Sequence, residues 1–200
     1  MIWNKRNKAV LILFGFLVLY SAVSLVNHYC FRTSALDLGA YTNALYDYIH
    51  FQWNDSTVFK QTRENLLADH FDIYLILFSP LSLLFGTYTL LIVQIVALVF
   101  GGYGVFRYFE SKSSGFLSLF AMLYFLSFFG VFSAISFDYH SNVVSACLIP
   151  WFFLFAHQRK RIPTLIFFVF ILIGKENISL WMFFICLAFI FDIRRSLLPV

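Results

Sequence analysis

Charged residues in this chain alternate in sign from one boundary of its apolar segments to the next. Ten of the fourteen Lys and Arg residues fall at every second boundary: Lys5, Arg6, Lys8, Arg107, Lys112, Arg159, Lys160, Arg161, Arg194 and Arg195. Eight of the ten acidic residues fall at the other boundaries: Asp37, Asp47, Asp55, Glu64, Asp69, Asp72, Asp138 and Glu176. Because the cytoplasmic ends of membrane helices are enriched in Lys and Arg, this pattern predicts a multi-pass plasma-membrane protein with a cytoplasmic N-terminus and its acidic loops outside.

The composition leads to the same class of protein. With 61% apolar and 12% charged residues, the chain has more hydrophobic side chains than one soluble domain of 200 residues can bury. We therefore predict an all-α, polytopic membrane domain over residues 1–200. The net charge of +4 comes from basic clusters beside apolar runs, so we interpret these clusters as topology determinants and expect no nucleic-acid site. Cys147 and Cys186 lie inside apolar segments and only Cys30 lies near the outer boundary, which favours neither a disulfide nor a metal framework.

The apolar runs predict the path of the chain. Residues 9–26 are long enough to span a bilayer and no small-residue cleavage site follows them, so we expect an uncleaved first span. Residues 27–70 form an outer loop. The remaining expected elements are spans at 88–106, 116–137 and 143–156, and a short helical hairpin made of 162–173 and 178–191.

Residues 71–85 are apolar but short, and Ser79-Pro80 interrupts them. If this segment crossed the membrane completely, Arg107 and Lys112 would lie outside and every later basic cluster would be inverted. We therefore predict a re-entrant or interfacial helix that has both ends outside.

The outer loop contains one helical pattern. Its apolar face consists of Leu38, Tyr41, Leu45, Tyr48, Ile49 and Gln52. The opposite side consists of Ala40, Asn43, Ala44, Asp47 and His50. This spacing predicts an amphipathic helix that lies along the membrane surface.

The predicted outer face collects most of the ionisable side chains: Asp37, Asp69, His70, Asp72, Asp138, His140, Lys175 and Glu176. Carboxylates and imidazoles at a partly desolvated boundary have shifted pKa values, which suits them to general-base catalysis or to cation binding. Asp37 has a structural alternative, because Ser34-x-x-Asp37 matches a capping box. Asp69-His70 also precedes an apolar helix, where capping explains the acid equally well.

Two further pairs leave alternatives open. Asp138-x-His140 offers two metal ligands, but nothing nearby completes a set, so we predict no metal site; a solvated loop explains the pair as well. Lys175-Glu176 lies inside an apolar hairpin whose arms are short, so its turn is expected below the outer surface. Charges at that depth require a partner, a water-filled cavity or a functional role.

The order of five motifs resembles the bacterial predicted-membrane-protein family called domain of unknown function 2079. The motifs are Leu36-Asp37-Leu38-Gly39-Ala40-Tyr41-Thr42-Asn43-Ala44-Leu45, Asp69-His70-Phe71, Leu90-Leu91-Ile92-Val93-Gln94, Phe137-Asp138-Tyr139-His140 and Gly174-Lys175-Glu176-Asn177. That family in turn resembles the GT-C glycosyltransferases, which use polyprenyl-phosphate sugars. This sequence departs from the GT-C pattern at 69–72, which read Asp-His-Phe-Asp where two prolines would follow the histidine. It departs from the pattern of the domain of unknown function 2079 family at Tyr139-His140-Ser141, where Phe-His-Pro is more usual.

The resemblance implies an expected set of roles. Asp37 would be the first-loop acid and candidate base, and Asp138 the later catalytic acid. The substrate and its lipid phosphate would be bound by Lys175, Glu176, His70, Asp69 and His140, with Lys175 facing the phosphate. The resemblance implies a polyprenyl-phosphate sugar as donor and is compatible with a divalent cation. Full-length relatives would have further spans and an outer domain, so we expect a short homologue, a truncated product or a fragment.

Three functions follow from these observations. The first is a GT-C-like transfer of a sugar from a polyprenyl-phosphate donor at the outer face. The second is a transporter or lipid-handling protein in which Lys175, Glu176 and Asp138 line a polar path. The third is an envelope assembly partner whose outer loop docks another protein.

Overall fold

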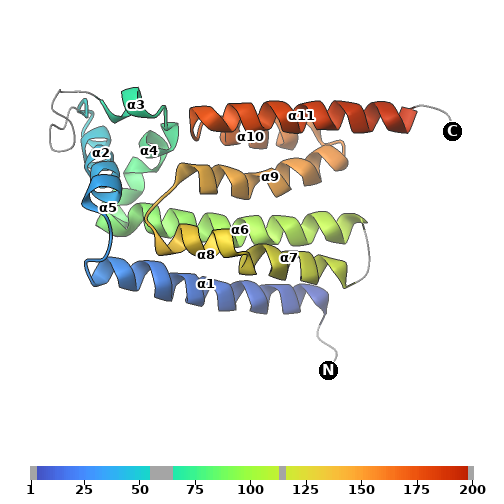
Figure 1. Ribbon diagram of the computed structural model, residues 1–200, viewed down its shortest axis with the longest axis horizontal. Helices are drawn as coiled ribbons and strands as arrows, with labels where there is room; N and C mark the ends of the chain where they lie inside the picture. The colour runs from blue at the N-terminus through green and yellow to red at the C-terminus, as the bar shows by residue number, and fades with distance from the viewer. Residues whose placement is uncertain (1–3, 55–64, 113–115, 198–200) are drawn as a thin grey trace.

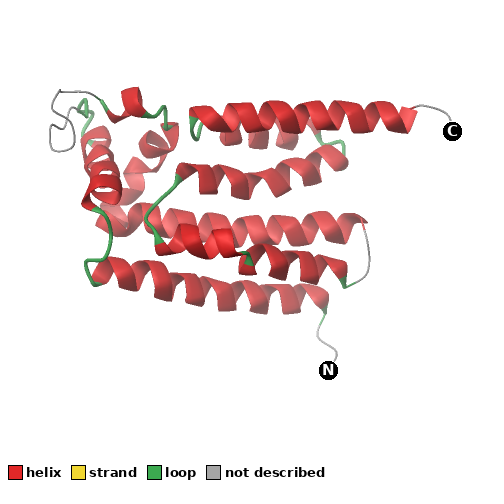
Figure 2. Cartoon of the chain, viewed as in Figure 1, coloured by secondary structure: helices red, strands yellow, loops and turns green. Residues whose placement is uncertain are grey.

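The computed structural model describes residues 4–54, 65–112 and 116–197, with side chains described as far as residue 190. Within these ranges every regular element is a helix (Figure 2), so the predicted all-α fold is confirmed. The elements are α1 (Lys5–Tyr29), η1 (Ala35–Gly39), α2 (Ala40–Ile49), α3 (Leu66–Asp69), α4 (Ile73–Phe78), η2 (Ser79–Leu81), α5 (Ser82–Phe85), η3 (Gly86–Tyr88), α6 (Thr89–Lys112), α7 (Leu117–Ser127), α8 (Phe129–Ser136), α9 (Ser141–His157), α10 (Arg161–Leu172) and α11 (Glu176–Leu197). Asp55 and Glu64 lie outside the described residues, as do the side chains of Arg194 and Arg195.

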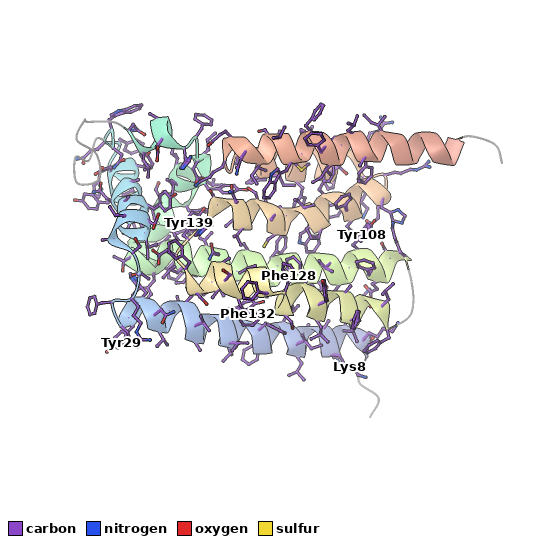
Figure 3. All side chains as sticks on the ribbon, viewed as in Figure 1. Lys8, Tyr29, Tyr108, Phe128, Phe132 and Tyr139 are labelled. Carbon is purple, nitrogen blue, oxygen red and sulfur yellow. The ribbon has the colours of Figure 1, made fainter. Side chains whose placement is uncertain are left out.

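The long helices run side by side along one axis, and successive passes alternate in direction (Figure 1). Lys8 and Tyr108 mark one end of this bundle, while Tyr29 and Tyr139 mark the other (Figure 3). We name the first the basic end, because it holds Lys5, Arg6, Lys8, Arg107, Lys112, Arg159, Lys160 and Arg161. We name the second the acidic end, because it holds Asp37, Asp69, Asp72, Asp138 and Glu176.

The helices have the length and composition of membrane segments. Three stretches are long and apolar enough to cross a membrane: Lys5–Tyr29, Ile73–Lys112 and Leu117–Ser136. The last of them is divided by Phe128, whose extended backbone separates α7 from α8. The helices α9 and α10 are apolar but shorter, at 17 and 12 residues.

The first helix shows how the surface differs from that of a soluble bundle. Its buried positions include Ala9, Leu13 and Tyr20, which face the other helices. Val10 and Phe14 lie one turn apart on another face and are about 60% exposed. Large apolar side chains exposed in rows are typical of a surface that contacts lipid.

Residues 71–85 fold as a short broken helix at the acidic end. The helix α4 gives way to a 3₁₀ turn at Ser79–Leu81, where Pro80 lacks the amide hydrogen that a regular helix needs. The helix α5 then ends at Gly86, which has φ +54° and ψ −132°, a backbone conformation that favours glycine. Both ends of the segment lie at the acidic end, and α6 starts from there (Figure 1).

The centre of the bundle is α6, which packs against α1, α7 and α9. A Cβ added to Gly101 would lie 2.8 to 2.9 Å from Cβ, Cα and O of Cys147. The approach of α6 to α9 is therefore as close as backbone allows. The indole of Trp151 adds a hydrogen bond of 3.0 Å to the carbonyl oxygen of Phe100. Small residues and interhelical hydrogen bonds are the usual means by which membrane helices associate.

The predicted faces of the loop helix are wrong in one respect. Ala40 and Ala44 were expected on the polar side, but both are buried. The reason is that α2 packs against α4 and η2, and small side chains allow this close contact. On the same side, buried Asn54 donates one hydrogen bond to Asn43 Oδ1, at 3.1 Å, and another to Asp47 Oδ2, at 2.8 Å.

The contact at Gly101 predicts a site-specific effect on stability. Gly101→Ala should lower the melting temperature in detergent, because the new methyl group would overlap Cys147 at a cost of about 1–3 kcal/mol. The measurement is thermal unfolding followed by tryptophan fluorescence. Gly15→Ala is the matched control, since nothing lies within 4 Å of the added Cβ and alanine favours a helix by about 1 kcal/mol. Equal shifts in both variants would contradict the proposed contact.

Candidate functional site

The acidic end begins with a cap that joins two distant segments. Ser34 precedes the turn η1, and its hydroxyl accepts a hydrogen bond of 3.3 Å from the amide of Asp37. In a capping box the Asp37 carboxylate would accept the reciprocal bond, but here the Ser34 amide donates to Oδ2 of Asp138, at 2.8 Å. Only one of the two hydrogen bonds of the predicted capping box is therefore formed. The second donor, the Ser34 amide, bonds to Asp138, which lies 104 positions away in the chain.

This replacement gives the two carboxylates different environments. Asp138 is buried, which raises its pKa, while the amides of Ser34 and Leu38 act in the opposite direction. Asp37 is half-buried, and among the described residues no hydrogen bond or ion pair engages its carboxylate. The negative charge of Asp37 lies close enough to Asp138 to raise the pKa of Asp138 further. Asp37 is therefore the acid of the pair that stays available to a ligand.

Gln94 holds the segment that presents Asp138. Its side chain is fully buried in α6, where its amide nitrogen donates to the carbonyl oxygens of Ala134, at 3.2 Å, and Asp138, at 3.1 Å. Its amide oxygen accepts from the backbone nitrogen of His140, at 2.7 Å. No role for Gln94 was predicted from the sequence. The signal that could have identified it is a single amide in the apolar run of a membrane helix, which requires internal partners.

A second cluster forms around Asp72, which caps α4 by accepting from the amide of Tyr74 at 3.1 Å. Asp72 is 1% exposed. Burial raises its pKa to about 6, although Ser141 and Lys175 both act to lower it. Ser141 lies close enough to lower the pKa of Asp72, but its contact lacks the geometry of a hydrogen bond, so Asp72 Oδ2, Ser141 Oγ and Tyr139 Oη have no well-formed hydrogen bond among the described residues. Three buried oxygen atoms without a well-formed hydrogen bond mark this cluster as a place that suits water or a polar group of a ligand.

Lys175 reaches the same cluster from the turn between α10 and α11. Its Nζ atom lies 3.4 Å from the Tyr41 hydroxyl and 5.9 Å from the centroid of the Tyr41 ring. The Tyr41 ring packs edge-on against Tyr139, with 5.9 Å between the ring centroids. Burial raises the pKa of Tyr41 to about 12, and the nearby carboxylates of Asp72 and Asp37 contribute. Lys175 is therefore a half-buried cation that faces carboxylates and phenols.

Glu176 points away from this cluster although it follows Lys175 in the chain. One carboxylate oxygen lies 3.1 Å from Nδ1 of His70, and the other accepts from the amide of Phe71 at 3.3 Å. The amide of its own helix start and His70 both lower the pKa of Glu176. The side chains of His70 and Glu176 are about half exposed, so this pair lies on the rim of the site.

The structure thus brings together most of the residues expected from the sequence. Asp37 and Asp138 meet at the start of α2, Lys175 lies beside Asp72, and His70 pairs with Glu176. The ring of His140 packs edge-on against Phe137, and its Nδ1 atom is buried without a partner among the described residues. Asp69 is exposed at the end of α3. Asp72, Tyr41, Tyr139 and Gln94 were not assigned roles from the sequence.

The raised pKa of Asp72 predicts a dependence of stability on pH. Between its usual value of 3.8 and about 6, the folded protein binds more protons than the unfolded chain, so stability should fall as pH rises through this window. The loss amounts to at most about 3 kcal/mol. Asp72→Asn keeps a capping oxygen and removes the titration, so its melting temperature should change much less between pH 4 and pH 7. Thermal unfolding in detergent measures this.

Asp37→Asn is the matched control for this experiment, because it removes a carboxylate from the same end of the bundle and leaves Asp72 in place. It should keep the decrease in melting temperature seen in the unmodified protein. If the melting temperature of Asp72→Asn fell by the same amount between pH 4 and pH 7, Asp72 would not be the group that titrates in this range.

Comparison with known proteins assigns the chain to a family. The model of a family described as predicted membrane protein (DUF2079) matches residues 27–197, a range that includes Asp37, Asp72, Asp138 and Lys175. No curated protein and no solved structure matches the chain. The match covers most of the chain and confirms the resemblance drawn from the five motifs. The chain belongs to the DUF2079 family of predicted membrane proteins.

Proposed function

We propose that this membrane protein is a glycosyltransferase of the GT-C type, which transfers a sugar from a polyprenyl-phosphate donor to an acceptor at the acidic end. The observation that supports this proposal is the position of Lys175 and Asp72 beside an apolar groove. In the proposed orientation the basic end faces the cytoplasm and the acidic end lies outside the plasma membrane. The lipid chain of the donor would then stay among the helices while its sugar meets the acceptor outside.

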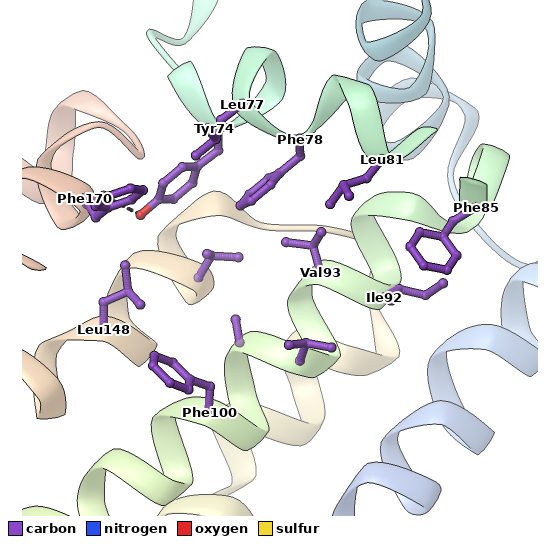
Figure 4. A pocket seen from close by; sticks show the side chains of 13 residues that line it. Tyr74, Leu77, Phe78, Leu81, Phe85, Ile92, Val93, Phe100, Leu148 and Phe170 are labelled. Carbon is purple, nitrogen blue, oxygen red and sulfur yellow. Dashed lines mark hydrogen bonds between the residues drawn. The ribbon is translucent and has the colours of Figure 1, made fainter. Parts of the chain in front are cut away.

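The groove has the shape and chemistry for a lipid chain. It has a volume of about 440 Å³ and lies between the α4–α5 segment and the helices α6, α9 and α10 (Figure 4). Its lining is apolar except for the hydroxyl of Tyr74. Leu77 and Val96 line the groove and are about half exposed on the surface of the bundle. A chain from the surrounding lipid could therefore enter it from the side.

Tyr74 connects this groove to the polar cluster. Its hydroxyl donates to the carbonyl oxygen of Phe170 at 2.5 Å and accepts from Ser145 Oγ at 3.2 Å. Ser145 in turn packs against Gly174, where an added Cβ would overlap its hydroxyl. Tyr74 and Ser145 both lie against Gly174, so the Tyr74 end of the groove lies next to the turn that carries Lys175. A donor with its chain in the groove would place its phosphate near Lys175.

The proposed reaction assigns a role to each group. The acceptor hydroxyl oxygen forms a bond to C1 of the sugar, and the bond between C1 and the donor phosphate oxygen breaks with its electron pair left on the phosphate. Asp37 accepts the proton of the acceptor hydroxyl. Lys175 stabilises the charge of the departing phosphate. Asp138 acts through the cap at Ser34 and positions Asp37.

The rim residues complete the proposed donor site. His70 and Glu176 form a pair beside the cluster, and Asp69 precedes His70 in the chain. We assign these three residues, with His140, to contacts with the sugar or phosphate of the donor. A divalent cation is compatible with the carboxylates at this end, although the described residues contain no group of three or more His, Cys, Asp and Glu arranged to hold a metal ion.

The proposed role of Asp37 predicts a loss of activity. Asp37→Asn should reduce sugar transfer by a factor of about 10² to 10⁴, because the amide cannot accept the proton. The assay follows release of polyprenyl phosphate from a radiolabelled polyprenyl-phosphate hexose in membranes that contain the protein. Glu110→Gln is the control, since Glu110 pairs with Arg6 and Arg107 at the basic end. Full transfer by Asp37→Asn would exclude Asp37 as the base.

The proposed role of Lys175 predicts a loss of lipid binding. Mass spectrometry of lipids that co-purify with the protein should detect polyprenyl phosphate, and Lys175→Met should lose it. Lys112→Met, which removes a lysine from the basic end, should retain it. A transporter or lipid-handling protein would instead show impaired lipid flux in Lys175→Met with no change in any glycan. Only bulk phospholipid, unchanged in both variants, would favour an assembly partner.

A further inference from the structure

A second cavity lies at the basic end, far from Lys175. It has a volume of about 350 Å³ and is formed by the turn between α9 and α10, at the opposite end of the bundle from Tyr139 (Figures 1 and 3). Its lining consists of Phe152, Ala156, Arg159, Arg161, Thr164, Leu165 and Phe168. The cavity therefore combines two guanidinium groups with an apolar floor.

The backbone of the turn directs both arginines to this cavity. Arg159 has φ +56°, a left-handed conformation that reverses the chain between α9 and α10. Arg159 and Arg161 line the cavity, whereas the ammonium of the intervening Lys160 lies 5.9 Å from the ring of Phe155. Alternate residues of the basic triplet thus point to the same space.

The charge of these arginines is not balanced within the part of the chain that the structure describes. The described ion pairs at the basic end join Arg6 and Arg107 to Glu110, at 3.5 and 3.4 Å. No described carboxylate pairs with Arg159 or Arg161. Two arginines that line one cavity suit a phosphate, because each guanidinium group offers a planar fork of donors.

The floor of the cavity indicates which phosphate compound it fits. Phe152 is buried, while Leu165 is 62% exposed on the outer surface of α10. Ile162, one turn before Leu165, is 75% exposed on the same helix. The guanidinium groups therefore lie directly next to apolar surface of the kind that contacts lipid chains. A free phosphate ion would make no use of this floor, but a phospholipid has both parts.

The first turn of α10 adds to the attraction. Lys160 is the residue before this helix and makes no side-chain capping hydrogen bond, and Thr164 Oγ1 donates to the carbonyl oxygen of Lys160 at 2.8 Å. Because Arg161 is the first residue of α10 and also lines the cavity, the positive end of the helix dipole lies beside the cavity. This contribution is small beside that of the guanidinium groups.

We propose that the cavity at the α9–α10 turn binds the headgroup of an anionic phospholipid such as phosphatidylglycerol. Arg159 and Arg161 hold the phosphodiester, and the first methylene groups of the acyl chains lie on Phe152, Leu165 and Phe168. This site is independent of the proposed sugar transfer, because it lies at the other end of the bundle and uses none of its residues. It fixes the turn that joins the two helices at the level of the lipid phosphates.

The test is native mass spectrometry of the full chain released from nanodiscs that contain phosphatidylglycerol and phosphatidylcholine. The unmodified protein should retain one phosphatidylglycerol per chain in preference to phosphatidylcholine. The double variant Arg159→Gln/Arg161→Gln should bind it at least about tenfold more weakly, since it removes both cationic groups of the site. Melting temperatures in a zwitterionic detergent verify that the variants fold.

The control is Lys8→Gln/Lys112→Gln, which removes the same charge from the same end outside the cavity. It should retain phosphatidylglycerol almost unchanged. Equal losses in the two double variants would overturn the proposal, because the lipid would then be held by general surface charge. Unchanged binding in Arg159→Gln/Arg161→Gln would overturn it as well. Displacement of the lipid by millimolar inorganic phosphate would show a site for the free ion, not for a lipid.

Discussion

Close contact between α6 and its neighbours determines where every other part of the molecule lies. In a lipid environment apolar side chains gain little by leaving the solvent, so helices associate through tight packing and interhelical hydrogen bonds. Gly101 lets α6 approach the backbone of Cys147, and Gly104 accommodates the indole of Trp151. These contacts fix α6 along its length, and the residues at its acidic end are placed with it.

The candidate site depends on this placement through a chain of polar contacts. Gln94 in α6 holds the backbone of Asp138 and His140, and the Asp138 carboxylate holds the amide of Ser34. A buried carboxylate is costly unless amides satisfy it, so Asp138 belongs to the scaffold in the described fold. Because the Ser34 amide donates to Asp138, the carboxylate of Asp37 does not accept the capping hydrogen bond of its own turn. The hydrogen bonds of Gln94 and Asp138 therefore leave the Asp37 carboxylate available to a ligand.

Sequence reasoning found the helices, the separation of charge and the gathering of ionisable groups at one end, since each follows from local composition and spacing. The predicted buried face of α2 was wrong, because alanine is compatible with either side of an amphipathic helix. The contact between α2 and α4 determines which side is buried. Sequence reasoning also gave Asp72 no role beside Asp69 and His70, although Asp72 is the buried acid. Ser141 and Tyr139 interact electrostatically with Asp72 but come from a later segment of the chain, so the local spacing of residues does not reveal them.

The sequence by itself determined that this chain is an all-helical membrane protein of the DUF2079 family, with most of its acids at one end and most of its bases at the other. The lengths of the apolar runs and the signs of the charges beside them are visible in the sequence. Membrane helices and their charged ends can therefore be predicted without the tertiary structure. Only the tertiary structure decided which charges are partnered and which remain available. Glu176 turns to His70 while Lys175 turns to Tyr41, because a side chain finds its partner by distance in space and not by adjacency in the chain.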